Sequence, residues 1–240
     1  LRMVMQELFR QARRSRLIIY DPAEGLLLPE SVKRSHRPIT KAERRHILAV
    51  AQTHPAGLWV LTILYTGLRP GETAALFWED IDFDRNEIHV YKAVESGTRT
   101  IKAPKTPAGI RDIPMRQELR ERLLAVRGEG TAPVFPSANG GIRSANSLRR
   151  LWNSFAHALD LHMGAKVRDG QILQHAIAPD LTPYCLRHTF CTDLQRAGVP
   201  INVAKELMGH ANISVTANIY THRDQKVLHN NMAKLNPKGR

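Results

Sequence analysis

Residues 182–222 read TPYCLRHTFCTDLQRAGVPINVAKELMGHANISVTANIYTH, and this stretch predicts three short helices in succession. Thr182, followed by proline, is a residue type that begins a helix, and Gly198 is a type that ends one. A second helix is expected from Pro200 to a glycine stop at Gly209, and a third follows it. These helices carry side chains that chemistry on a phosphate could use, so the rest of the chain is interpreted as the frame that positions them.

The side chains in question are two tyrosines, an arginine and a histidine. Tyr184 and Arg187 lie one turn apart on the first helix, on a different face from its apolar residues. His210 follows the glycine stop of the second helix directly, and Tyr220 comes ten residues after that histidine. The apolar face, which should pack on the core, consists of Leu186, Phe190 and Leu194.

Two helices are expected upstream of this stretch. Thr40 and Glu43 have the spacing of a capping box, so one helix should begin there. The next segment, AGLWVLTILYTG, is apolar on every side and predicts a buried helix that Gly67 ends. Arg69 is thereby placed at the junction between the buried helix and another one, whose first turn would contain Pro70.

The pattern then changes to short runs of residues that favour strands. These runs cover residues 87–94, 98–103 and 111–115. A small antiparallel sheet is therefore expected, with Lys102 and Lys105 at the tip of its last connection.

Helical periodicity returns in residues 116–126 and 144–159. Residues 160–181 have no clear period and are expected to form a loop that includes His162 and His175. The complete pattern predicts an α+β fold that is mostly helical and contains one small antiparallel sheet.

The composition describes a globular protein with a strongly basic charge. The 240 residues include 35 Lys and Arg against 22 Asp and Glu, which gives a net charge of +13. Such a charge favours a polyanionic partner, of which nucleic acid is the commonest, although a membrane surface would attract it as well and the charge could also serve solubility alone. No apolar run is long enough to cross a membrane. Cys185 and Cys191 lie six apart on one predicted helix and suggest a reducing cytoplasm.

Four local motifs occur in order along the chain: TGLRPGE at 66–72, PKTPAGIRDIP at 104–114, LRHTF at 186–190, and MGH with a tyrosine ten residues after its histidine. In this order they resemble the catalytic domain of the tyrosine recombinase family, also called the phage integrase family. The resemblance covers roughly residues 38–222. It is greatest to integrases of conjugative transposons and related prophages.

The resemblance implies a site that holds a DNA phosphodiester while it is attacked. Arg69 and Arg187 would stabilise the negative charge that develops on the nonbridging oxygens, because guanidiniums hold phosphate with paired hydrogen bonds. His210 would donate a further hydrogen bond to the same phosphate. Glu72 would orient Arg69 by charge pairing.

The same resemblance assigns the covalent step to Tyr220. Its hydroxyl would form a 3′-phosphotyrosine that preserves the bond energy for resealing, so neither a metal nor a nucleotide cofactor is implied. Lys105 matches the family lysine that would protonate the departing 5′-oxygen. Lys102 is its competitor, because a hairpin tip can bring either amine inward.

One position departs from the family pattern. Most relatives have a histidine three residues before the second arginine, where this chain has Tyr184. A phenol has a reference pKa of about 10, so at neutral pH it can donate a hydrogen bond but accepts a proton poorly. We therefore expect Tyr184 to have a positioning role, and we interpret the neighbouring His188 as structural.

The resemblance also implies a domain organisation and partners. Residues 1–37 would be the end of a core DNA-binding domain with its linker, 38–222 the catalytic domain, and 223–240 a tail able to dock on a neighbouring protomer. The partners would be double-stranded DNA recombination sites held by a homotetramer, with no membrane involved. The protein would work in the bacterial cytoplasm, on the nucleoid.

Two other functions remain open at this point. A type IB topoisomerase would use the same chemistry to relax supercoils as a monomer. A DNA-binding regulator without catalysis would satisfy the charge and the helices, but it leaves the four ordered motifs unexplained. A metallohydrolase is weaker still, because the histidines lack ligand spacing on a common helix face.

Overall fold

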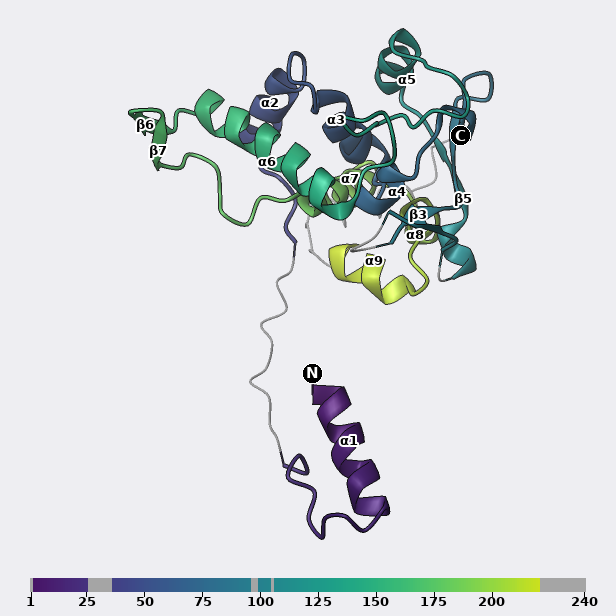
Figure 1. Cartoon of the computed structure of the whole chain (residues 1–240). Helices are drawn as coiled ribbons and strands as arrows, with labels where there is room; N and C mark the ends of the chain where they lie inside the picture. The colour runs from purple at the N-terminus through teal and green to yellow at the C-terminus, as the bar shows by residue number, and fades with distance from the viewer. Residues whose placement is uncertain (1, 26–35, 96–98, 105, 221–240) are drawn as a thin grey trace, which may run out of the picture. The chain divides into compact units, whose positions relative to one another are not determined.

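The computed structural model (Figure 1) describes the chain over residues 2–25, 36–95, 99–104 and 106–220. The chain divides into two compact units, residues 1–35 and 36–240. The first unit contains the helix α1 (Arg2–Arg14). Arg13 and Arg14 lie in its last turn, where basic side chains interact favourably with the helix dipole. All other elements belong to the second unit.

The second unit begins with α2 (Lys41–Val50) and α3 (Gly57–Thr66). The predicted capping box is present, because Thr40 and Glu43 each accept a hydrogen bond from the backbone amide of the other. α3 is buried on almost every side and ends at Gly67, whose φ of 66° is left-handed and favours glycine. Both predicted helices are confirmed.

A short helix and a small sheet follow. α4 (Pro70–Ala74) starts directly after Arg69, as the motif predicts, and the 3-10 turn η1 (Trp78–Asp80) leads into the sheet. The sheet is antiparallel in the order β1-β2-β5, and its strands are β1 (Ile81–Asp82), β2 (Glu87–Val90) and β5 (Arg111–Pro114). Buried Ile88 pairs with buried Ile113 across its middle.

The expected single sheet is divided in two. β3 (Ala93–Val94) and β4 (Ile101–Lys102) pair only with each other. The break falls at Tyr91 and Lys92, whose hydroxyl and ammonium bond to Asp80 Oδ1 at 2.7 and 2.9 Å. Asp80 is buried and therefore needs these partners. The turn η2 (Pro107–Gly109) then leads into β5.

Two further helices are confirmed, α5 (Gln117–Ala125) and α6 (Ala145–His162). Figure 1 shows α6 as a long helix, and it packs against α2. The side chains that fill the core between these helices and α3 include Trp59, Phe155, Ile47, Leu119 and Leu159. None of the described helices is both long enough and apolar enough to cross a membrane.

The expectation of a loop over residues 160–181 is wrong. α6 continues to His162, and an antiparallel hairpin follows it. Its strands are β6 (Lys166–Arg168) and β7 (Gln171–Gln174). Both strands are mostly exposed, so they lack the alternation of apolar and polar residues that marks a half-buried strand. The available signal was the Asp-Gly pair at the turn, where Asp169 and Gly170 both have positive φ, as hairpin turns of this kind require.

The segment after the hairpin is also ordered by a specific contact. His175, which we expected in a loop, bonds through Nδ1 to Oδ2 of Asp160. The other Asp160 oxygen accepts from the backbone amides of Ala176 and Ile177 at 2.6 and 3.1 Å. Asp160 is 1% exposed, so these bonds fasten the segment to α6.

The three helices of the opening stretch are confirmed as α7 (Pro183–Arg196), α8 (Ile201–Met208) and α9 (Ile213–Tyr220). α7 packs on α3, and α9 packs on both α7 and α8. Thr182 occupies the N-cap position of α7, but its side chain makes no capping hydrogen bond. Leu186 faces the core and is fully buried, whereas Phe190 and Leu194 are only partly buried.

The two cysteines of α7 behave as core residues. Cys185 and Cys191 are free and completely buried. Burial raises the pKa of the Cys191 thiol to about 11, although the nearby charge of Arg187 opposes the increase. The Cys191 thiol is therefore protonated and unreactive at neutral pH.

Candidate active site

Arg69 lies at the junction between α3 and α4, where the backbone is extended. Its Nη1 donates to Glu72 Oε1 at 2.7 Å, and its Nη2 donates to the Gly209 carbonyl at 3.0 Å. The Arg69 backbone amide donates to Glu72 Oε2 at 2.8 Å. Glu72 therefore holds the arginine at both ends, while 36% of the Arg69 side chain remains exposed.

Arg187 approaches the same place from α7 and is almost completely buried. Its Nη1 donates to the carbonyl of Gly67, and its Nη2 donates to the carbonyl of Met208. Nη1 also lies 4.0 Å from Glu72 Oε2. Arg187 thus joins the C-terminal ends of α3 and α8, where free carbonyls carry partial negative charge.

A third arginine, Arg111 on β5, completes the cluster, and our sequence interpretation did not select it. Its Nη1 and Nη2 donate to the two Glu72 oxygens at 3.2 and 2.9 Å, and its Nε donates to the Leu207 carbonyl at 2.9 Å. The signal was present in the motif IRDIP: Arg111 and Ile113 share the buried face of the strand. An arginine on a buried face must have a partner, and that partner is Glu72.

Glu72 is the carboxylate that all three arginines share within the described part of the chain. Burial by itself would raise the pKa of Glu72, but the hydrogen bonds and charge of Arg111, with the charges of Arg187 and Arg69, lower it to about 2. The carboxylate is therefore ionised at neutral pH. Three cations around one anion leave an excess of positive charge, which suits a phosphate.

Burial also changes the pKa of Arg187. Burial first, and the charge of Arg69 next, lower the pKa of Arg187 to about 9, although the Glu72 charge opposes them. The guanidinium stays protonated at neutral pH, because about 9 is still well above 7.

His210 follows Gly209 and is buried beside the arginines. Burial, and then the charges of Arg187, Arg69 and Arg111, lower the pKa of His210 to about 4, so the ring is neutral at pH 7. Its Nδ1 lies 2.9 Å from Thr216 Oγ1 on α9. Because a hydroxyl can donate to Nδ1, the neutral ring can carry its proton on Nε2 and donate from there.

A cavity of about 470 Å³ opens beside these groups. Arg69, Arg187 and His210 line it, together with Tyr184 and the imidazole of His36. The cavity therefore gives an anion access to the arginines and to the histidine at once.

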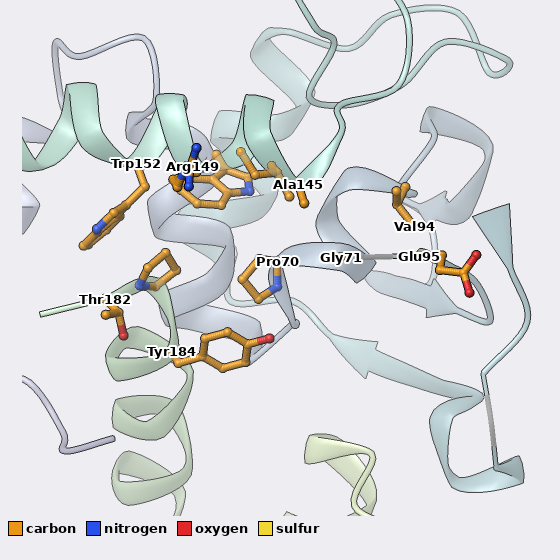
Figure 2. Close-up of a pocket in the computed structure, with 12 residues that line it drawn as sticks. Pro70, Gly71, Val94, Glu95, Ala145, Arg149, Trp152, Thr182 and Tyr184 are labelled. Carbon is orange, nitrogen blue, oxygen red and sulfur yellow. The ribbon is translucent and has the colours of Figure 1, made fainter. Parts of the chain in front are cut away.

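Tyr184 lies in the first turn of α7 and is 44% exposed. Its ring stacks on His36, with the ring centroids 5.0 Å apart and the planes 16° apart. Figure 2 shows Tyr184 facing a second cavity, of about 410 Å³, whose opposite wall includes Arg149 and Trp152 of α6. Tyr184 lines both cavities, and its positioning role stays a prediction.

The two candidate lysines differ in what the structure describes. Lys102 on β4 lines a third cavity, of about 690 Å³, that also reaches Arg69 and Glu72. Its Nζ bonds to Glu95 Oε1 at 2.7 Å. Lys105 lies outside the described residues, so its assignment as general acid stays a prediction.

Tyr220 is the last residue of α9. That helix is connected to the cluster by the hydrogen bond between Thr216 and His210, and it packs on α7 and α8. The Tyr220 side chain lies outside the described part of the structure, and its role as nucleophile stays a prediction.

The structure brings the predicted residues Arg69, Glu72 and Arg187 into one contact network with Arg111, and it places His210 on the wall of the same cavity. Such a network can bind a phosphate and stabilise charge that develops on it. Over the described ranges, no group of three or more His, Cys, Asp or Glu side chains could hold a metal ion.

The fold and this cluster belong to a known class of protein. The model of the phage integrase family matches residues 37–226, which is more than half of the chain. The chain therefore belongs to the phage integrase family.

Individual relatives agree with this assignment. The chain is 29% identical over 218 residues to a XerC-like tyrosine recombinase of Caldanaerobacter subterraneus subsp. tengcongensis, covering 86% of this chain and 56% of that protein. It is 30% identical over 166 residues to the transposase of transposon Tn916 from Enterococcus faecalis, covering 68% of this chain and 41% of that protein. The chain thus spans about half the length of the curated relatives it matches.

Among solved structures, the fold matches the Tn1549 transposon integrase in complex with circular intermediate DNA. The TM-score is 0.73 at 25% identity, over 98% of this chain and 78% of that one. The expected α+β architecture is confirmed by this match together with the observed helices and sheets.

Proposed function

We propose that this chain is the catalytic part of a site-specific DNA recombinase that acts through a covalent 3′-phosphotyrosine. One observation carries the proposal. Arg69, Arg187 and the neutral His210 converge on one open cavity in a domain of the phage integrase family. Two guanidiniums and an imidazole N–H supply the donors that a phosphodiester under attack requires.

In the proposed reaction the Tyr220 hydroxyl attacks the phosphorus, and the bond from phosphorus to the 5′-oxygen breaks. Lys105, with Lys102 as the competing candidate, protonates the departing oxygen. The 5′-hydroxyl of another strand then attacks the phosphotyrosine and releases Tyr220. Because each step exchanges one phosphate ester for another, the reaction needs no external energy source.

The proposal extends to partners and assembly. The related Tn1549 integrase was solved with circular intermediate DNA, which supports double-stranded DNA as the partner. We place residues 1–37 at the end of a DNA-binding domain with its linker, 38–222 in the catalytic domain, and 223–240 in a tail that docks on a neighbour. The active form would be a homotetramer on the nucleoid in the bacterial cytoplasm.

The test is covalent capture. The chain is incubated with duplexes that carry candidate element ends and a nick beside the cleavage position, so that the released fragment diffuses away. A protein–DNA adduct on a denaturing gel is expected for the unchanged chain and should be absent for Tyr220→Phe. Tyr20→Phe, at an exposed tyrosine of the first unit, is the matched control and should form the adduct normally.

The outcomes separate the alternatives. An adduct that persists in Tyr220→Phe would contradict the assigned nucleophile. Relaxation of a supercoiled plasmid that lacks any element end would favour a type IB topoisomerase. Sequence-specific binding with no adduct on any site would favour a regulator without catalysis.

A further inference from the structure

The reaction proposed above needs a proton acceptor, and the arginine cluster does not supply one. The nucleophilic phenol must lose its proton as its oxygen bonds to phosphorus. Arg69 and Arg187 are cations, and His210, with a pKa of about 4 beside them, is a weak base. The phenol of Tyr184 belongs to a residue type that accepts protons poorly near neutrality.

An imidazole lies at the edge of the same cavity. His36 is the first residue of the second unit and lines the cavity with Arg69, Arg187 and His210. Its ring face stacks on Tyr184, and its Nδ1 lies 3.4 Å from Thr182 Oγ1. With its proton on Nδ1, the ring donates to Thr182 Oγ1 and leaves Nε2 without a proton, so Nε2 is the nitrogen that can accept one.

The backbone next to His36 is anchored to α2, to the segment before α7 and to α7 itself. Arg37 donates to both Glu43 oxygens at 2.7 and 2.8 Å, and its Nε donates to Asp180 Oδ2 at 2.9 Å. The Ile39 amide donates to Thr189 Oγ1 on α7 at 2.8 Å. The imidazole is therefore held against α7 before any DNA binds, as a preorganised catalytic group should be.

We propose that His36 is the general base of the cleavage step, an assignment that rests on the proposed function. Nε2 of His36 accepts the phenolic proton of Tyr220 as the oxygen–phosphorus bond forms and the bond to the 5′-oxygen breaks. The 5′-oxygen receives its proton from the lysine. In the rejoining step the attacking 5′-hydroxyl gives its proton to the lysine, and the imidazolium returns its proton to the Tyr220 oxygen, so atoms and charges balance over the cycle.

Several charged and titratable groups share the cavity with His36. Tyr184, Arg187 and His188 face it from α7, Arg69 from the junction of α3 and α4, and His210 from the end of α8. The entering phosphate adds negative charge, which stabilises the imidazolium as it forms. His188 is the rival base, because it also lines the cavity.

Single-turnover cleavage rates of the nicked site across the pH range test the assignment. His36→Phe keeps an aromatic face for Tyr184 but loses the nitrogen, so we expect the rate at pH 7 to fall by about 10²-fold or more. The increase of the cleavage rate with pH, which a general base confers, should be lost in this variant. His46→Phe, at a histidine of α2 that contacts His162, is the matched control and should keep the original profile. Added imidazole should restore part of the rate to His36→Ala.

A second substrate distinguishes a base from an acid. A 5′-bridging phosphorothiolate leaves without protonation, so the defect of His36→Phe should persist on it. Relief of the defect by sulfur would place His36 at the leaving group and overturn the assignment. A normal dependence of the cleavage rate on pH in His36→Phe would also overturn the assignment. The same holds if His188→Phe, and not His36→Phe, loses the increase of the rate with pH. Circular dichroism confirms that each variant is folded.

The proposed function and this inference fail in different ways. If the unchanged chain forms no adduct at all, the proposed function itself fails. If the unchanged chain cleaves normally and His36→Phe cleaves at the same rate, only this inference fails.

Discussion

Three arginines share one carboxylate at the centre of this protein, but they are not equivalent. Arg69 keeps about a third of its side chain exposed and can meet a phosphate as it stands. Arg111 is buried and gives its hydrogen bonds to Glu72 and to main-chain carbonyls. We infer that Arg111 fixes Glu72, and that Glu72 in turn fixes Arg69.

The variant Arg111→Met tests this hierarchy. It removes two hydrogen bonds from a buried, ionised Glu72, so we expect a loss of about 3 kcal/mol in the free energy of unfolding. Arg85→Met, which breaks an exposed pair with Glu87, should cost under about 1 kcal/mol. Urea unfolding of both variants provides the comparison, and equal losses would contradict a special role for Arg111.

The lowered pKa of His210 should make the free energy of unfolding depend on pH in a specific way. The folded state resists protonation of the ring until about pH 4, whereas the unfolded chain binds the proton from about pH 6.5. Between these values the unfolded state holds more protons, so stability decreases as the pH falls from 6.5 to 4, by on the order of 3 kcal/mol. In His210→Gln this part of the loss should be missing. Unfolding measured at several pH values would refute the idea if both proteins lost stability equally.

The turn between α8 and α9 holds the site together because it brings backbone and side chains into close contact. Gly209 has a φ of 61°, and a Cβ there would lie 2.7 Å from Arg111 Nη1 and 3.1 Å from the Ala108 carbonyl. Its own carbonyl accepts the hydrogen bond from Arg69. One glycine therefore allows β5, α8 and the α3–α4 junction to meet.

Gly209→Ala should consequently cost more than its conformation alone explains. We expect a loss of about 3 kcal/mol, since strain and overpacking act together, and reduced adduct formation with it. Gly170→Ala is the matched control: its φ is 76°, but nothing lies within 4 Å of the added Cβ, so about 1 kcal/mol is expected. Equal losses in thermal unfolding would show that crowding at Gly209 is unimportant.

The elements that could be predicted from the sequence are those with local signals. The capping pair at Thr40 and the glycine stop at Gly67 mark helix ends wherever the chain lies. The hairpin after His162 was missed because its strands are exposed, and its only local signal was an Asp-Gly turn. Arg111 was missed for a different reason, since its partner Glu72 is 39 residues away in sequence and only the fold brings them together.

At the level of the entire chain, the charge of +13 predicts how binding responds to salt. If the protein neutralises about four DNA phosphates, its Kd should rise by about 100-fold between roughly 50 and 200 mM salt. Arg69→Gln should lower the slope of log Kd against log salt concentration by the amount that corresponds to about one phosphate contact. Fluorescence anisotropy with a labelled duplex measures both slopes, and a Kd that does not respond to salt would exclude a phosphate-dominated interface.

The two sealed thiols of α7 have a practical consequence. Maleimide and haloacetamide dyes react with exposed thiolates. Cys185 and Cys191 are both completely buried, and the raised pKa of Cys191 keeps its thiol uncharged, so neither should react with such dyes. A single cysteine engineered on α5 and another on α1 would therefore accept a donor and an acceptor dye with little background. Energy transfer between them would then measure the distance between the two units, with and without DNA, in a protein that keeps all its native residues elsewhere.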